Sequence, residues 1–278
     1  MSTSGYHLVE LGQGVFAFVD PDPRFGRSNV GLVIDEDGLT VIDTTATPLR
    51  AAQVGEAIRE LTAHLALPVK RVVLTSSRIA FSGGGQQFWS AAFYGSESTS
   101  SQLDVPVNPA ALRALLPEYA SAFHDEFTTR PVTHIISQPI QLTPALAVTP
   151  LTGESAGNLA VTVESVNVIF AGALASFGVT PLAYDAFPES WIDRLHRWSE
   201  AGVTVVPGHG PPGGAADLRD LAEYLVACRQ AKTPSDLGDG PWRHWTDRRF
   251  DQVNIDRAFL RSEGRDEVPS SMFELLGL

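Results

Sequence analysis

The sequence predicts an α/β fold in which mixed β-sheets carry helices on their outer faces. Three observations lead to this prediction. Short apolar runs bounded by glycine, proline or aspartate recur along the chain, as is typical of strands. Longer segments between them have apolar residues at helical spacing. The second half of the chain repeats the strand, helix and strand order of the first half, which favours sheets with helices outside them.

In the first half, apolar runs at 14–20 and 28–45 predict strands, and "DEDG" within the second run indicates a tight hairpin. Residues 47–65 predict a helix, with Thr47 as its N-cap and Pro48 at its first position. The other elements predicted in this half are a strand at 69–76 and helices at 83–92 and 108–127, the last interrupted by Pro117.

The second half of the chain predicts several strands, followed by a helix, a strand and a helix. Together with the first half, these elements form a single predicted domain that spans residues 1–231. Residues 232–278 are polar and rich in aspartate, arginine and tryptophan, and we interpret them as an extension packed on that domain, with a helix near 250–262. The elements predicted in this half are strands at 145–153, 159–165, 166–174 and 203–214 and helices at 188–202 and 215–231.

Composition excludes several classes of function. The chain has 278 residues, 44% of them hydrophobic, so a sizeable core is expected. Its net charge of −12 provides no electrostatic basis for binding nucleic acid or an anionic membrane. Cys228 is the single cysteine, which rules out an internal disulfide and a cysteine-based zinc cluster. The N-terminal segment lacks the features of a signal peptide and no apolar run is long enough to span a membrane, so we expect a cytoplasmic protein.

Several ordered segments resemble the metallo-β-lactamase fold superfamily over roughly residues 8–230. "SNVGLVIDEDGLTVIDTT" resembles the opening hairpin of the family, which ends in an aspartate, here Asp43. "LTGESAGNLAV", "VIFAGAL" and "VVPGHGP" resemble three later motifs of the family. The resemblance implies a four-layer αββα sandwich with its active site along one edge, plus the helical C-terminal extension. It also implies a homodimer.

The same resemblance implies that most metal ligands have been replaced. "LTSSRIAFSGG" lies where the family carries T-H-x-H-x-D-H-x-G-G, and only His209 remains of the usual ligand set. The positions of the missing ligands are occupied by Ser76, Arg78, Ala80, Phe81, Glu154 and Ala173.

Ligand counting then argues against a zinc pair. A catalytic zinc typically has three protein ligands, whereas only Glu154 and His209 remain, and Arg78 adds a fixed positive charge. We therefore expect neither a metal nor another cofactor. A single metal held with help from His7 or His134 is the less favoured alternative.

The catalytic candidates are Glu154, His209 and Arg78. Glu154 beside Phe81 could serve as an acid or base with a raised pKa, and His209 could transfer protons near neutrality. Arg78 could clamp a carboxylate or stabilise an oxyanion. The alternatives are an internal Arg78–Glu154 ion pair and a His209 that is only structural.

Other residues are candidates for substrate binding. We place Ser76, Ser77, Phe81 and Ala173 at the expected site, and Trp242 at its opening. Serine hydroxyls in such a turn more often cap the backbone, and tryptophans in an extension more often anchor it to the body. The glycines at 83–85 could offer N–H groups to an anion.

Three hypotheses of function follow. The first is a metal-independent enzyme that performs acid–base chemistry, such as cyclisation, dehydration, decarboxylation or isomerisation, on a small, largely apolar substrate with a carbonyl group. The second is a pseudoenzyme that acts as a binding or partner protein. The third is a residual metal-dependent hydrolase of esters or thioesters. A direct Arg78–Glu154 contact would favour the second, and a gap between them the first.

Overall fold

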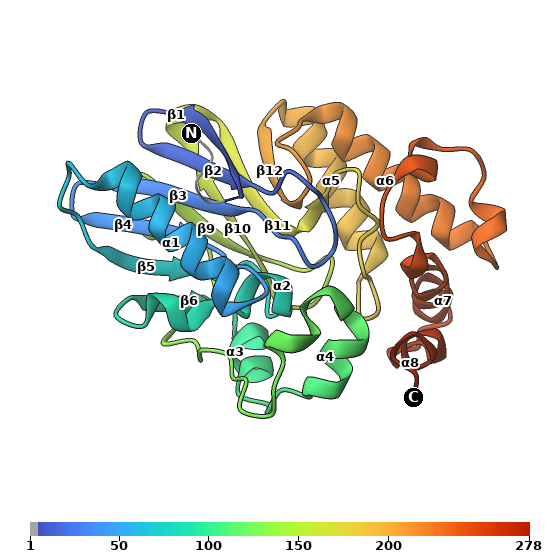
Figure 1. Ribbon diagram of the computed structural model, residues 1–278. Coiled ribbons are helices and arrows are strands. Elements are labelled where there is room, and N and C mark those ends of the chain that lie inside the picture. The colour runs from blue at the N-terminus through green and yellow to red at the C-terminus, as the bar shows by residue number, and fades with distance from the viewer. Residues whose placement is uncertain (1–4) are drawn as a thin grey trace.

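The computed structural model describes residues 5–278 and consists of two β-sheets that face each other. Figure 1 shows α1 on the outer face of one sheet and α5 and α6 against the other. The larger sheet has seven strands in the order β1-β2-β3-β4-β5-β6-β7, and the smaller has five in the order β12-β11-β10-β9-β8. The strands of the larger sheet are β1 (His7–Gly12), β2 (Val15–Val19), β3 (Val30–Asp35), β4 (Gly38–Ile42), β5 (Val69–Val73), β6 (Ala92–Gly95) and β7 (His134–Ile135). Those of the smaller sheet are β8 (Ile140–Gln141), β9 (Ala147–Leu151), β10 (Asn158–Val163), β11 (Val168–Ser176) and β12 (Thr204–His209).

Three apolar cores separate the four layers. Alternate side chains of both sheets meet in the central core, with Val33 and Val73 on one side and Val161 and Phe170 on the other. A second core lies between the larger sheet and α1 (Pro48–Thr62). A third lies between the smaller sheet and two helices, α5 (Pro188–Ala201) and α6 (Ala215–Gln230). The predicted αββα sandwich is therefore confirmed.

Local signals in the sequence account for most elements. Thr47 accepts a hydrogen bond from the N–H of Arg50 and caps α1, as predicted. Gly202 ends α5 in the left-handed conformation that glycine adopts without strain. The predicted helix at 108–127 is shorter, because α4 (Pro109–Leu115) ends before Pro117 and only a 3₁₀ turn follows. The predicted helix at 83–92 is only the 3₁₀ turn Gly85–Phe88.

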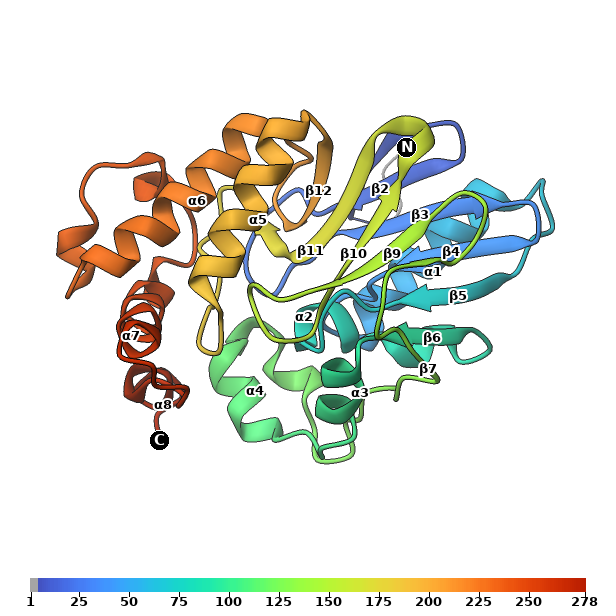
Figure 2. The same ribbon diagram turned by 180° about the vertical axis from the view of Figure 1, so that it is seen from behind.

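The C-terminal segment packs on the body of the protein (Figure 2). It contains α7 (Asp251–Ser262), close to the predicted helix, and α8 (Ser270–Leu276), which was not predicted. Trp242 and Ile255 join the core beneath α6, and Met272 joins a further apolar cluster near α4. No helix within residues 5–278 is long and apolar enough to cross a membrane.

Candidate functional site

Loops from both sheets meet at one edge of the sandwich. The loop after β5 carries Ser76 to Arg78 and continues into the short helix α2 (Ile79–Ser82), while Glu154 follows β9 and His209 ends β12. Thr75 ties the two sheets together at this edge. Its N–H and hydroxyl donate to the carboxylate of Asp43 at 2.8 and 2.7 Å, and its carbonyl accepts from the N–H of Leu159 at 2.8 Å.

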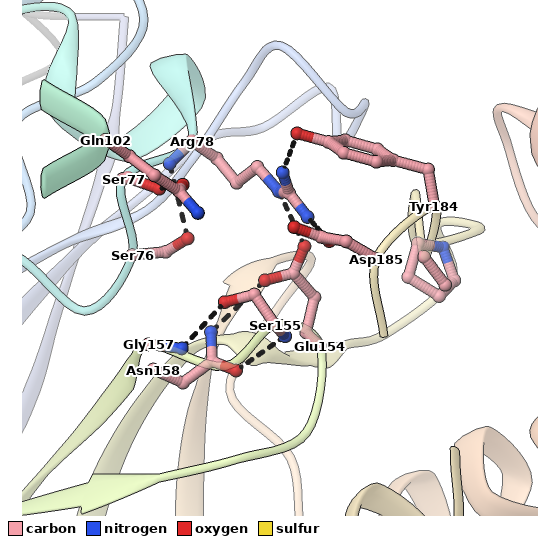
Figure 3. A network of polar contacts seen from close by, with 12 residues as sticks. Ser76, Ser77, Arg78, Gln102, Glu154, Ser155, Gly157, Asn158, Tyr184 and Asp185 are labelled. Carbon is pink, nitrogen blue, oxygen red and sulfur yellow. Dashed lines mark hydrogen bonds and ion pairs between the residues drawn. The ribbon is translucent and has the colours of Figure 1, made fainter. Parts of the chain in front are cut away.

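Arg78 and Glu154 form a direct, buried ion pair (Figure 3). Nε of Arg78 donates to Oε1 of Glu154 at 2.8 Å, and the two residues are only 8% and 3% exposed. The second carboxylate oxygen accepts from Nδ2 of Asn158 at 3.1 Å, so both oxygens of Glu154 are engaged by protein groups. Burial raises the pKa of Glu154, and the charge of Arg78 opposes the rise.

The remaining guanidinium nitrogens of Arg78 bind a loop that sequence reasoning did not single out. Nη1 donates to the Tyr184 hydroxyl and Nη2 to the Asp185 carboxylate, as Figure 3 shows. The guanidinium carbon lies 4.0 Å from the centre of the Tyr184 ring, which is the geometry of a cation–π contact. Burial lowers the pKa of Arg78, but the neighbouring Glu154, Tyr184 and Asp185 outweigh this effect and raise it well above the ordinary value. Arg78 is thus a permanent cation fixed by three partners.

One signal in the sequence points to this loop. It leaves the end of β11, which is parallel to β12, so its residues begin at the same sheet edge as His209. A Tyr-Asp pair in the otherwise apolar stretch "PLAYDAF" at such an edge is a reasonable candidate for a site.

The ring of His209 is enclosed by aromatic side chains. Its centroid lies 5.3 Å from that of Phe81 and 5.7 Å from that of Phe25. Nδ1 donates to the carbonyl of Arg27 at 3.3 Å. Burial lowers the pKa of His209 to about 4, so the imidazole is neutral at physiological pH and is a weak base there.

Five of the predicted site residues line one very small cavity. Its volume is about 10 Å³, close to the space that a single water molecule needs. The predicted residues around this cavity are Arg78, Phe81, Glu154, Ala173 and His209. The structure therefore brings these predicted side chains together, but they leave no room for a substrate among them.

A much larger cavity lies on the other side of Arg78. Its volume is about 330 Å³, within the range of small-molecule sites. Arg78, Phe25 and Leu182 line both cavities, so they form the wall between them. The apolar lining comes mainly from α4, from the segment before it and from α8, with Leu103, Val105, Val107, Ala111, Leu112, Leu115, Met272 and Leu276 among the lining residues. Ser77, Gln102, Thr129 and Tyr184 add polar groups.

The other predicted binding residues have different surroundings. Ser77 lines the large cavity and donates to Gln102. Ser76 is buried, and its hydroxyl accepts from the N–H of Arg78 at 3.3 Å. Trp242 lies apart from both cavities, where Nε1 donates to the carbonyl of Leu237 and the ring packs near Tyr224. Trp242 therefore anchors the extension to the body and, contrary to the substrate-binding prediction, lines neither cavity.

The glycine run after α2 is used for close packing. A Cβ atom on Gly83 would lie 2.1 Å from the carbonyl oxygen of Ala46, and one on Gly84 would lie 2.2 Å from that of Thr44. The N–H groups of these two glycines donate to the carbonyls of Ile79 and Thr45. These two groups are therefore engaged within the protein and do not face a free anion.

The C-terminal extension holds the loop that carries Tyr184 and Asp185. Oδ1 of buried Asn254 accepts from the N–H of Ala183 at 2.9 Å, and Nδ2 donates to the carbonyl of Pro181 at 2.7 Å. Nε of Arg257 donates to the carbonyl of Ala186 at 2.9 Å. The extension thereby determines where the partners of Arg78 lie.

The residues at this edge do not fit a metal pair. Arg78, Phe81 and Ala173 offer no ligand atom, Arg78 and Asn158 already engage the carboxylate of Glu154, and His209 is packed between phenylalanines. Within residues 5–278, no group of three or more His, Cys, Asp or Glu side chains is arranged to hold a metal ion. His7 lies at the start of β1 and His134 in the edge strand β7.

Comparison with solved structures identifies the fold. The chain is similar to the metallo-β-lactamase from Erythrobacter litoralis (TM-score 0.58, 19% identity, 80% of this chain and 98% of that one). It is also similar to the Pseudomonas aeruginosa metallo-β-lactamase FIM-1 in its mono-zinc form (TM-score 0.57, 19% identity, 78% and 95% covered). A third similar enzyme is from Hirschia baltica (TM-score 0.56, 20% identity, 78% and 96% covered). No family model matches the sequence. The chain has the metallo-β-lactamase fold, and at these identities the likeness concerns the fold alone.

Proposed function

We propose that this protein is a metal-independent, non-catalytic member of its fold that binds a small, largely apolar molecule. The direct contact between Arg78 and Glu154 carries the proposal. A general base must reach the proton that it removes, but both oxygens of Glu154 accept hydrogen bonds from protein groups, and the adjacent cavity holds about 10 Å³. The ion pair acts as a brace across the catalytic edge of the fold.

The large cavity supports the binding part of this proposal. It is mainly apolar, has a volume of about 330 Å³ and shares Arg78 with the braced edge. The ion pair closes the edge of the sandwich, but it leaves the large cavity beside that edge open to a ligand.

A double-mutant cycle with Arg78→Met and Glu154→Gln tests the brace. Removing one member of a buried ion pair leaves the other charge uncompensated and costs about 3–5 kcal/mol in general. We expect less for Glu154→Gln, because Asp185 and Tyr184 still face Arg78. The double variant should lose less stability than the two single losses added together. A higher melting temperature for Glu154→Gln, as replacement of a catalytic residue often gives, would overturn the proposal.

A metal-independent enzyme is the second candidate. The convergence of Glu154, His209, Phe81 and Ala173 on one small cavity favours it. In this case the loop with Tyr184 and Asp185 has to move away to admit substrate. The enzyme would then turn over an apolar carbonyl compound, and Glu154→Gln would reduce the rate by about 10²–10⁴ while the protein stays folded. A residual hydrolase is tested with a panel of esters and thioesters, with zinc added and with zinc chelated.

The assembly of the protein is a separate proposal. We propose a homodimer on the resemblance alone, and a cytoplasmic location because the sequence shows no signal-peptide features and no long apolar run. Light scattering at working concentration should give twice the mass of the chain, and the mass of a single chain would contradict this proposal without affecting the fold.

A further inference from the structure

The large cavity is lined by a partly buried polar group, the Tyr184 hydroxyl, that the Arg78–Glu154 ion pair does not explain. The Tyr184 hydroxyl accepts from Nη1 of Arg78, and among residues 5–278 it has no acceptor for its own proton. Arg78 lowers the pKa of this hydroxyl, but burial and the nearby carboxylates outweigh the effect and raise it. The hydroxyl is therefore protonated at physiological pH, and it lines the cavity as a hydrogen-bond donor.

A second donor lies at the open side of the same cavity. Ser77 donates to Oε1 of Gln102, and Nε2 of Gln102 has no acceptor in the part of the chain that the structure describes. Gln102 is exposed, whereas Tyr184 is partly buried, so the two groups differ in their access to water. A donor removed from water favours a ligand that brings an acceptor, because an unpaired buried polar group is costly.

Charge restricts the ligand further. The single positive charge of Arg78 faces the carboxylates of both Glu154 and Asp185. No surplus positive charge is left on this wall for a carboxylate or phosphate, and the remaining walls are mainly apolar. An anion would lose its hydration without gaining a cation in return.

We infer that the large cavity takes an uncharged, largely apolar molecule whose carbonyl or other acceptor oxygen receives a hydrogen bond from the Tyr184 hydroxyl. This inference rests on the proposed binding function and adds to it the ligand class and the residue that selects it. The occupant is a small molecule, because the cavity volume of about 330 Å³ lies in the range of small-ligand sites.

Three probes that share one ring system test the inference by calorimetry. They are 2-acetylnaphthalene, which carries a carbonyl, 2-ethylnaphthalene, which has no acceptor, and 2-naphthoate, which is an anion. We expect the ketone to bind about 2- to 10-fold more tightly than the hydrocarbon, the effect of one neutral hydrogen bond, and the anion to bind most weakly. Tyr184→Phe should reduce ketone binding to the level of the hydrocarbon and leave hydrocarbon binding unchanged.

Two variants on one helix show whether the probes occupy this cavity. Ala111 lines the cavity, and its neighbour Ala110 is exposed and does not. Ala111→Phe should abolish binding of the ketone and the hydrocarbon, while Ala110→Phe should leave both unchanged. Equal binding by Ala111→Phe and the wild type would overturn the inference. A gain or loss of self-association in Ala111→Phe without any probe binding would overturn it too, and would assign the cavity to a second copy of the chain.

The two levels of proposal fail in different ways. Tightest binding by 2-naphthoate, or no effect of Tyr184→Phe on the ketone, overturns the ligand class but leaves a binding protein. Conversion of the ketone to a product that Glu154→Gln cannot form contradicts the proposed non-catalytic function instead, even where the ligand class is correct.

Discussion

The guanidinium of Arg78 and the carboxylate of Glu154 form a buried ion pair, although the two residues are 76 positions apart in the sequence. The resemblance to the fold superfamily places both residues at positions of metal ligands. Arg78 is cationic and Glu154 is anionic, so the pair is neutral overall. In the family, metal ions and their protein ligands occupy this edge instead. The pair also joins the larger sheet to the smaller one, because Arg78 follows β5 and Glu154 follows β9.

The first prediction concerns the planar guanidinium group of Arg78. Arg78→Lys keeps the positive charge but cannot direct separate N–H groups to Glu154, Tyr184 and Asp185. We expect the free energy of unfolding to fall by roughly 1–3 kcal/mol, because buried acceptors lose partners. Chemical denaturation measures this change.

Arg71→Lys is the matched control for that variant. Arg71 binds Asp37, whose side chain is 49% exposed, and Lys70 already lies beside the same carboxylate. An ion pair whose carboxylate is solvent-exposed contributes little to stability, so the control should change stability little. Equal losses in both variants would contradict a special role of Arg78.

The second prediction concerns Asp43. Burial raises the pKa of Asp43 to about 7, and the hydrogen bonds from Thr75 oppose the rise. The folded protein therefore holds a proton on Asp43 that the unfolded chain releases at lower pH. Stability from this group is fully present below the ordinary pKa of an aspartate, about 3.9, and is lost as pH rises through about 7.

Asp43→Asn removes this titration and can keep both contacts, since an amide accepts from the Thr75 N–H and donates to its hydroxyl. The stability of the variant relative to the wild type should increase with pH between about 4 and about 7 and then level off. Denaturant titrations at several pH values measure it. Asp37→Asn is the control, because Arg71 and Lys70 lower the pKa of Asp37 to about 2. The stability of this variant relative to the wild type should therefore not change with pH from pH 5 upwards. A flat difference for Asp43→Asn would contradict this prediction.

The sequence was sufficient to predict the sandwich and five of the nine residues that line the small cavity. Strand runs and helix caps are local signals, and the spacing of the family motifs placed Phe81, Ala173 and His209 together. It could not show whether Arg78 and Glu154 touch, because that depends on side-chain rotamers and on the distance between two loops. The partners Tyr184 and Asp185 belong to no motif, and their position depends on contacts with the extension. The large cavity is also nonlocal, since its walls come from segments more than 150 positions apart, such as Leu112 and Met272.

The third prediction concerns the contact between α7 and the 181–186 loop. Asn254→Ala leaves the N–H of Ala183 and the carbonyl of Pro181 without their buried partner. We expect a loss of about 1–3 kcal/mol and faster hydrogen exchange at Ala183 and its neighbours, because this loop opens more often. Hydrogen exchange with mass spectrometry measures the rates.

Gln252→Ala is the control on the same helix. Its side chain donates to the carbonyl of Lys232 and to Asp256 and does not bind the loop. Exchange in residues 181–186 should then match the wild type. If hydrogen exchange in residues 181–186 is as slow in Asn254→Ala as in Gln252→Ala, the extension does not determine where Tyr184 and Asp185 lie.

The fourth prediction concerns metals. We expect the purified protein to carry well under one zinc ion per chain, because a zinc site needs about three protein ligands and the fixed charge of Arg78 repels a divalent cation. Glu154 would first have to leave Arg78 and Asn158, and His209 would have to leave its place between Phe25 and Phe81. Since no metal affinity is coupled to folding in this proposal, a chelator should leave the melting temperature unchanged.

Arg78→His provides the informative comparison, because it removes the cation and adds a ligand beside Glu154. If binding is limited by the charge of Arg78, this variant should take up more zinc than the wild type. Elemental analysis that finds near two zinc ions on the wild-type protein, retained after mild chelation, would show that the ion pair opens for metal and that the brace is not permanent.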